Sequence, residues 1–169
     1  FATQEAQRTV HTGSQQASSS LEIIGNVYGK TTATTKASTA SANLQCIEFT
    51  IGNTAGGTPI DITQMLVTFV CGDKADVIPF DKTNSIVSGG TGEIASGSWG
   101  VNNTYNDVDG RNHLLEPGEQ FVLQIKFPSA DAAKLTPNTR FSVNLQPAIG
   151  TAYPIKKTVP STLYEVNIL

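Results

Sequence analysis

The stretch from Leu44 to Cys71 constrains the fold of this chain more than any other. Its first part, LQCIEFTIGN, alternates the apolar residues Ile47, Phe49 and Ile51 with polar ones. A period of two predicts a β-strand with one buried face. A turn-forming cluster, GNTAGGTP, follows it,. The next segment has apolar residues on both parities from Ile62 to Val70, which predicts a strand covered on both sides,. The two strands predict the centre of an all-β domain.

Shorter patterns of the same kind run through the rest of the chain. Apolar and polar residues alternate cleanly from Gln120 to Phe127 and again in RFSVNLQP at 140–147,. Four more segments predict short strands: LEIIGNVY at 21–28, ADVIPF at 75–80, AYPIKKTV at 152–159 and TLYEVNIL at 162–169. The Gly-rich segment at 85–100 predicts a long loop or an irregular hairpin,. About seven to nine short strands separated by turns predict a mainly β protein, an immunoglobulin-like antiparallel β-sandwich.

The first twenty residues have a different pattern. Small or apolar residues recur at steps of three and four, which predicts a helix, and they are Ala2, Ala6, Val10, Gly13 and Ala17,. The stripe is thin and the opposite face is polar, so the helix either lies on the domain surface or packs against copies of itself as the end of a longer helix. We favour the second because the pattern is already under way at Phe1. The expected domains are a helix at 1–20 and a β-sandwich at 21–169.

Composition excludes several classes of function. Charged residues make up 15% of the chain and the net charge is -3, so neither a basic surface for nucleic acid nor an acidic tail is present,. The segment GNVYGKT has one residue too few for a phosphate-binding loop, and no G-x-S-x-G elbow occurs,. Only His11 and His113 could be the base of a Ser-His-Asp relay, and the sequence places no Ser beside either,. We therefore expect no enzyme and no catalytic residues.

Oxygen-bearing side chains gather in the segment from Asn102 to Glu119. The four that could bind a cation are Asn106, Asp107, Asp109 and Asn112. These are hard donors of the kind that Ca²⁺ prefers, although the spacing excludes an EF-hand. The alternative is a polar turn in which these side chains cap backbone groups. In the same segment, Asn102-Asn103-Thr104 is an N-x-T acceptor sequence for glycosylation, which is meaningful only outside the cell,.

Taken in order, the pieces resemble the archaeal flagellins, or archaellins, the subunits of the archaellum. The resemblance rests on SSSLEIIGNVYG, on the spacing L-x-x-I-x-F-T-I-x-N, on PIDIT before the next strand and on L-x-P-G-E-x-F before another. It implies an extracellular filament subunit that is made by cleavage of a signal peptide. Its hydrophobic helix, like that of type IV pilins, would pack in the filament core, with the β-sandwich on the outer surface. The apolar half of that helix would lie upstream of Phe1, and only through it would the chain contact a membrane before assembly. Archaellins often carry N-glycans and some carry a metal, which would suit Asn102 and the loop of Asp107 and Asp109.

The two cysteines depart from this resemblance, because archaellins are usually poor in Cys. Cys46 and Cys71 lack the C-x-x-C spacing of a zinc or redox site,. An exported chain with two cysteines favours a disulfide, which would close a loop of about 25 residues and add roughly 3 kcal/mol. Their strand positions argue the other way, because Cys46 points away from the face of Ile47 whereas Cys71 shares the parity of Phe69. We expect the bridge, with two free buried thiols as the alternative.

Two functions from different classes follow from these observations. The first is a structural subunit that associates with itself and with other archaellins into a helical filament for swimming, through a repeated contact that does not close. The alternative is a carbohydrate-binding or adhesive β-sandwich of a secreted protein or type IV pilin. A carbohydrate platform needs several exposed aromatic side chains, whereas the chain has one Trp and four Tyr,. That deficit favours the filament subunit.

Overall fold

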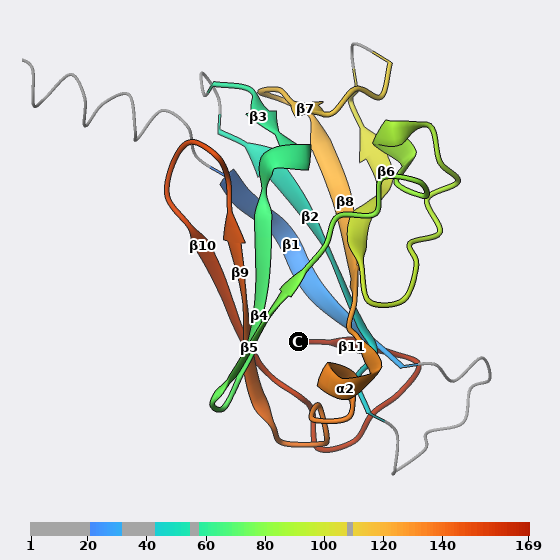
Figure 1. Ribbon diagram of the computed structural model, residues 1–169, viewed down its shortest axis with the longest axis vertical. Coiled ribbons are helices and arrows are strands. Elements are labelled where there is room, and N and C mark those ends of the chain that lie inside the picture. Colours follow the sequence, from blue (N-terminus) through green and yellow to red (C-terminus); the bar gives the residue numbers. More distant parts are fainter. Residues whose placement is uncertain (1–20, 32–42, 55–57, 108–109) are drawn as a thin grey trace, which may run out of the picture.

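The computed structural model describes residues 21–31, 43–54, 58–107 and 110–169 (Figure 1). The helix predicted at 1–20 and most of the Thr/Ala/Ser-rich stretch at 30–43 lie outside the described residues. The described part is mainly β and antiparallel, as the sequence predicts, and contains eleven strands. None of its helices has the length and apolar character that crossing a membrane requires.

Nine of these strands form two sheets that pack face to face. The five-stranded sheet has the order β11-β1-β2-β8-β6, with bounds Val166–Ile168, Leu21–Lys30, Cys46–Asn53, Gln120–Lys126 and Trp99–Tyr105. The four-stranded sheet has the order β10-β9-β4-β5, with bounds Tyr153–Thr158, Arg140–Gln146, Leu66–Cys71 and Lys74–Ile78. The short strands β3 (Ile60–Asp61) and β7 (Leu114–Leu115) pair separately. Three short helices complete the described elements: η1 (Ile62–Gln64), η2 (Ile86–Ser88) and α2 (Ser129–Ala132).

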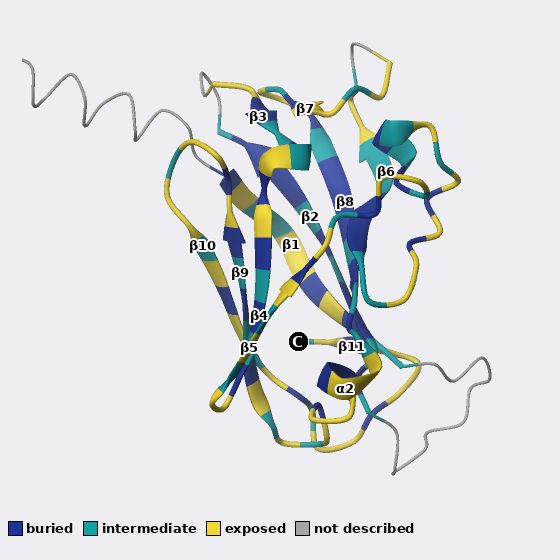
Figure 2. Cartoon of the chain, in the orientation of Figure 1, coloured by how far each residue is buried: buried dark blue, intermediate teal, exposed yellow. Residues whose placement is uncertain are grey.

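The core lies between the two sheets because alternate residues of their strands point inward (Figure 2). The alternation predicted in β8 and β9 is confirmed, since Phe121, Leu123 and Val143 are fully buried. Aromatic rings join the layers: the centroid of Phe69 in β4 lies 5.1 Å from that of Phe127, the residue after β8. Each fully buried large side chain contributes about 1.5–3 kcal/mol to folding, so this layer of contacts holds the two sheets together.

The two strands of the Leu44–Cys71 stretch do not pair with each other. β2 pairs with β1 and β8, whereas β4 pairs with β5 and β9. They belong to different sheets and face each other across the core. The long turn region between them carries the chain from one sheet to the other, which a two-residue hairpin turn would not do.

The prediction of a single strand from Ile62 to Val70, covered on both sides, is wrong in its extent. β4 begins only at Leu66, because the chain first forms β3 and then the turn of η1. Asp61 stops the earlier strand, since its Oδ1 accepts the Thr63 N–H at 3.0 Å and caps η1,. Ile62 is buried, but it belongs to η1 and not to β4. Within β4 only one face is covered, and Leu66 on the other face is 48% exposed.

Candidate functional site

The loop predicted to bind Ca²⁺ leaves β6 at one end of the molecule and returns to β8. Asn106 is exposed and has φ 57°, a left-handed turn position that Asn tolerates,. The Oδ1 of Asn112 accepts the Leu114 N–H at 2.9 Å, which is an Asx-type turn,. Asp107 is half-buried, and Asp109 lies outside the described residues.

The described donors of this loop do not by themselves make a Ca²⁺ site. Ca²⁺ takes six to eight oxygen ligands, and the Asn112 oxygen is already used in the turn. Among the described residues, no group of three or more His, Cys, Asp or Glu side chains could hold a metal ion. Because Asp109 is not among them, Ca²⁺ binding stays a prediction. A rise in melting temperature on adding Ca²⁺ to chelator-treated protein would support it, and no change would refute it.

Asn102, the predicted glycosylation residue, lies in β6 next to a shift in strand register. Its Nδ2 donates to the carbonyl of Gly92 at 2.8 Å and ties the Gly-rich loop to the strand. Gly92 has φ +86°, and a Cβ there would lie 2.7 Å from the Asn102 carbonyl oxygen, so only Gly fits this contact,. A glycan replaces one of the two Nδ2 hydrogens, so modification requires the remaining one to keep the bond. Glycosylation of Asn102 stays a prediction.

Asp81 organises the Gly-rich loop, and sequence reasoning missed it. Its Oδ1 accepts the backbone N–H groups of Thr83 and Asn84 at 3.1 and 3.0 Å. Its Oδ2 accepts the Asn84 side-chain amide and the Ala95 N–H, both at 2.9 Å. Burial by itself raises the pKa of Asp81, but these hydrogen bonds outweigh it and hold the pKa below its ordinary value,. A local sequence signal could have revealed this role, because D-K-T-N at 81–84 has the composition of an Asx turn,.

The same loop is fastened to β6 by backbone bonds and by one serine. The N–H of Asp81 donates to the Trp99 carbonyl at 2.8 Å, and the Trp99 N–H donates to the Pro79 carbonyl at 3.0 Å. Ser85 is fully buried, and its Oγ accepts the Val101 N–H at 3.0 Å. The segment that the sequence predicted as a loop is therefore a loop with a fixed shape.

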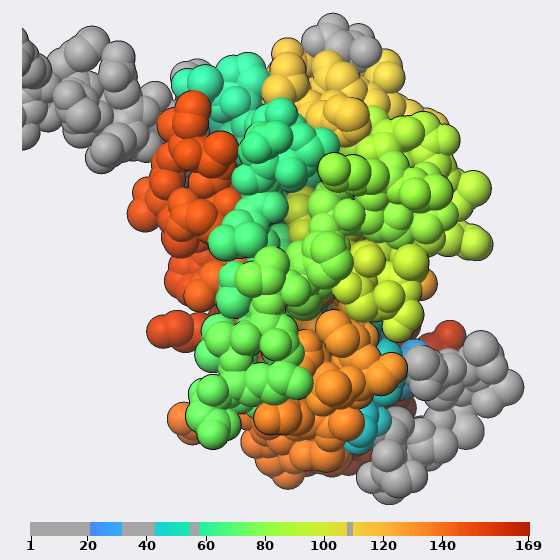
Figure 3. Space-filling view, viewed as in Figure 1, coloured from blue at the N-terminus to red at the C-terminus, as the bar shows by residue number. Residues whose placement is uncertain are grey.

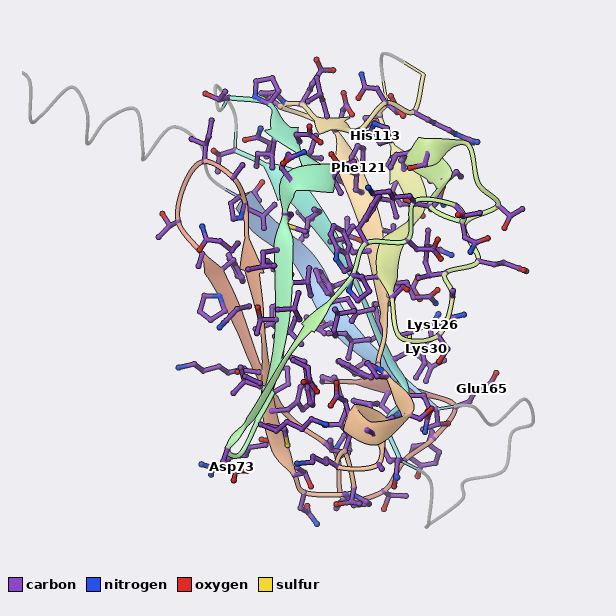
Figure 4. The ribbon with its side chains drawn as sticks, viewed as in Figure 1. Lys30, Asp73, His113, Phe121, Lys126 and Glu165 are labelled. Carbon is purple, nitrogen blue, oxygen red and sulfur yellow. The ribbon has the colours of Figure 1, made fainter. Side chains whose placement is uncertain are left out.

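His113 has a neighbouring serine that the sequence did not reveal. Ser88 Oγ lies 3.1 Å from His113 Nε2, beside a pocket of about 360 Å³ that is also lined by Thr63, Phe80 and Lys82. His113 lies at the end of the molecule where the loop between β6 and β8 runs, which we call the loop end (Figure 4). Ser88 is the hydrogen-bond partner that the structure gives for the imidazole, and a catalytic relay also needs a carboxylate that orients the histidine.

The structure records both cysteines as free thiols, contrary to the expected disulfide. Cys46 points to the outer side of the five-stranded sheet, where its strand partners are Lys30 and Lys126. Burial raises the pKa of the Cys46 thiol to about 12. Cys71 points into the core from the four-stranded sheet. The two side chains leave different sheets in directions that do not meet, which explains physically why no bridge forms.

A buried carboxylate also lies at the opposite end of the molecule, in α2. Asp131 is fully buried, and its Oδ1 lies 3.1 Å from Lys74 Nζ at the start of β5. Lys74 also contacts Asp76 at 3.2 Å. Burial raises the pKa of Asp131 and its hydrogen bond with Asp76 raises it further, whereas the same bond lowers the pKa of Asp76,. These three residues link the β4–β5 hairpin to the segment after β8, at the end of the molecule that we call the hairpin end.

Comparison with known proteins gives a consistent result. A sequence profile of archaeal-type flagellins matches residues 1–157. "Probable flagellin 1" of Archaeoglobus fulgidus is 30% identical over 171 residues, which cover 100% of this chain and 79% of that protein. "Probable flagellin 2" of the same organism is 27% identical over 174 residues, with the same coverage.

Two solved structures share the fold. The archaeal flagellum of Methanospirillum hungatei has a TM-score of 0.60 at 18% identity, covering 100% of this chain and 82% of that chain. A crystal structure of an archaeal flagellin from Methanocaldococcus jannaschii has a TM-score of 0.65 at 20% identity, covering 88% of this chain and 94% of that chain.

Proposed function

The chain belongs to the archaeal-type flagellin family, and from this premise we propose that it is a structural subunit of an archaellum. In this proposal it associates with itself and with other archaellins into an extracellular helical filament used for swimming. The observation that carries the proposal is the family match over residues 1–157, together with the fold that the chain shares with the archaeal flagellum of M. hungatei. Flagellins are structural proteins, so the Ser88–His113 pair needs no catalytic role.

We assign the two parts of the chain different tasks within the filament. Residues 1–20 form the end of the polymerisation helix, and residues 21–169 form the head domain on the filament surface. Support for the first comes from the helical spacing of small and apolar residues, and for the second from the two packed sheets. Neighbouring strands that are distant in sequence, such as β2 beside β8 and β4 beside β9, support an immunoglobulin-like class for the head,.

The structure weakens the alternative of a carbohydrate-binding module. Trp99, the only tryptophan of the chain, is 1% exposed, and its ring packs against that of Phe80 with centroids 4.8 Å apart. It therefore cannot serve as a stacking platform for a sugar ring. Of the exposed tyrosines, Tyr105 lies on strand β6 and Tyr164 next to strand β11, the two opposite edges of the five-stranded sheet, and Tyr28 lies on strand β1 beside β11.

Expression from the complete gene in an archaeal host that lacks its own flagellins tests the function. We expect filaments by electron microscopy, with this chain in them by mass spectrometry, and restored swimming. Deletion of residues 1–20 is the matched control and should abolish filaments while leaving a folded head domain. Secretion of the intact chain without filaments would refute the proposal.

A further inference from the structure

The outward face of the four-stranded sheet is unusually poor in charge for an exposed antiparallel sheet. Such a face ordinarily carries polar and charged residues. Here the strand alternation places only two charged side chains, Arg140 and Lys156, at outward positions, and no acidic one. Leu66 and Val77 on the same face are 48% and 60% exposed. In the space-filling view no other described segment lies across this face (Figure 3).

A groove lies over the corner of this face where the two cations stand. Its volume is about 400 Å³, and its lining includes Val70, Gly72, Ser142 and the basic residues Arg140, Lys156 and Lys157. The floor is small or apolar and the rim is positive. The complement of such a surface is a narrow apolar strip that carries a carboxylate.

The outward face of the five-stranded sheet is covered by its own side chains along the described strands β2 and β8. Cys46 and Val122 stand at outward positions but are only 6% and 8% exposed, because neighbouring side chains cover them. Lys30 and Glu48, on adjacent strands, form an ion pair across the same face. A partner would gain little apolar burial over these central strands, in contrast to the edge strand β11 of the same face,.

The edge strand β11 and the residues before it form a strip with the required properties. Tyr164, Val166 and Ile168 are 58%, 51% and 66% exposed. Glu165 is exposed at the start of this strip and points away from the body of the molecule (Figure 4). Asn167 fixes the strip in place, because its Nδ2 donates to the carbonyls of Gly29 and Tyr164, and its Oδ1 accepts the Tyr164 N–H at 2.8 Å.

We infer that the outward face of the four-stranded sheet receives the strip Tyr164–Ile168 of a second copy of this chain, with Glu165 of that copy beside Arg140 and Lys156. Apolar surface then meets apolar surface, and one anion meets two cations. Because the two surfaces are different and lie on different sheets, each copy keeps one of each free, which is the heterologous contact that builds a helical polymer. The inference rests on the proposed filament function and identifies the contact between neighbouring head domains in the filament.

Cysteine cross-linking in assembled filaments tests the contact directly. A chain carrying both Ser142→Cys and Val166→Cys, expressed in the flagellin-deficient host, should give a ladder of dimers, trimers and larger species on non-reducing gels after oxidation. Either substitution alone should give monomers. The matched control pairs Val166→Cys with Thr50→Cys, which lies on the outward face of the five-stranded sheet, and should also give monomers.

Charge reversal provides a second measurement. Lys156→Glu and Glu165→Lys should each reduce filament yield several-fold, and the double variant should recover it to within about twofold, since the pair is restored with opposite sense. Filaments without a ladder, or a ladder with Thr50→Cys instead, would overturn the inference and leave the proposed function intact. Protection of Ser142→Cys from maleimide without a ladder would assign the face to another partner and would also overturn it. Absence of filaments from the unsubstituted chain would instead refute the proposed function.

Discussion

The two ends of the molecule attach an irregular segment to a sheet with a buried aspartate, but they surround that aspartate differently. At the loop end, Asp81 receives hydrogen bonds from three backbone N–H groups and one side-chain amide. At the hairpin end, Asp131 meets an ammonium group and a second carboxyl group. The same residue type therefore has its pKa lowered at one end and raised at the other.

The difference shows that burial alone does not decide the charge state of a carboxyl group. Neutral donors that point at the oxygens outweigh burial and stabilise the ionised form of Asp81, whereas burial and then the neighbouring Asp76 both stabilise the protonated form of Asp131,. Lys74 acts to lower the pKa of Asp131, but its ammonium group also contacts Asp76. The attachment at the loop end should therefore be most stable when Asp81 is ionised. The attachment at the hairpin end should be most stable when Asp131 and Asp76 share one proton.

The largest expected effect comes from removing the carboxylate at the loop end. Asp81→Ala leaves the N–H groups of Thr83, Asn84 and Ala95 without their acceptor, and we expect a loss of about 3 kcal/mol in the free energy of unfolding. Asp81→Asn keeps one acceptor oxygen and should lose about half as much. Urea unfolding measures both variants. Asp73→Ala, in the exposed turn of the β4–β5 hairpin, is the control and should stay within about 0.5 kcal/mol of the unsubstituted protein,.

Stability measured against pH sharpens the comparison, because the two aspartates predict opposite slopes. The pKa of Asp81 is lowered by folding, so its contribution is present above the ordinary carboxyl pKa and is lost as the pH falls through the folded value,. The pKa of Asp131 is raised by folding, so its contribution is present at low pH and is lost as the pH rises through the folded value,. From about pH 3 to pH 7, the advantage of the unsubstituted protein over Asp81→Asn should grow, and its advantage over Asp131→Asn should shrink.

The facing groups at the hairpin end are Lys74 and Asp76, and the pKa of Asp76 moves in the opposite direction to that of Asp131. The comparison with Asp131→Asn is therefore repeated in an Asp76→Asn background. Parallel slopes for Asp81→Asn and Asp131→Asn would contradict the account of the two ends.

Most of the strands could be predicted from the sequence, and the failure at Ile62–Val70 has an identifiable cause. In β8 and β9 one element fills the whole pattern, so alternation indicates correctly which residues point into the core. From Ile62 to Val70 the pattern crosses from η1 into β4, so residues with different orientations look like one strand buried on both faces. The cap at Asp61 was the local signal of that break.

The aspartates at the two ends could be predicted to different degrees. Asp81 binds residues within 14 positions of itself, and its D-K-T-N context is a readable turn signal. Asp131 binds Lys74 and Asp76 from a distant hairpin in the other sheet, and no local pattern marks that pairing. The free cysteines have the same explanation, since the choice of sheet for β2 and β4 is a property of the whole topology.

Thiol reactivity extends the comparison to Cys71, beside the hairpin end, and Cys46, on the covered outer face. With a pKa of about 12, Cys46 is almost fully protonated at pH 8, and we expect its reaction with a thiol reagent to be on the order of a thousandfold slower than that of an exposed cysteine,. Cys71 is buried and its Sγ lies 3.6 Å from the Arg140 carbonyl, so it should also react slowly. Protein prepared without reductant should show two thiols in denaturant. A count of none would establish the disulfide that the structure lacks.

The smallest expected effect concerns another hydrogen bond that holds the Gly-rich loop, from the Asn102 side-chain amide to the Gly92 carbonyl. Asn102→Ala removes this bond from a half-buried position, and we expect a loss of about 1 kcal/mol in the free energy of unfolding. Thr104→Val destroys the same glycosylation sequence but keeps the hydrogen bond and a β-branched side chain in β6, so it should change stability by less than about 0.5 kcal/mol. Protein from an archaeal host should lose any glycan mass in both variants. Because only one of them also loses the tie to Gly92, equal destabilisation of the two would show that the glycan, and not the hydrogen bond, stabilises this end of the molecule.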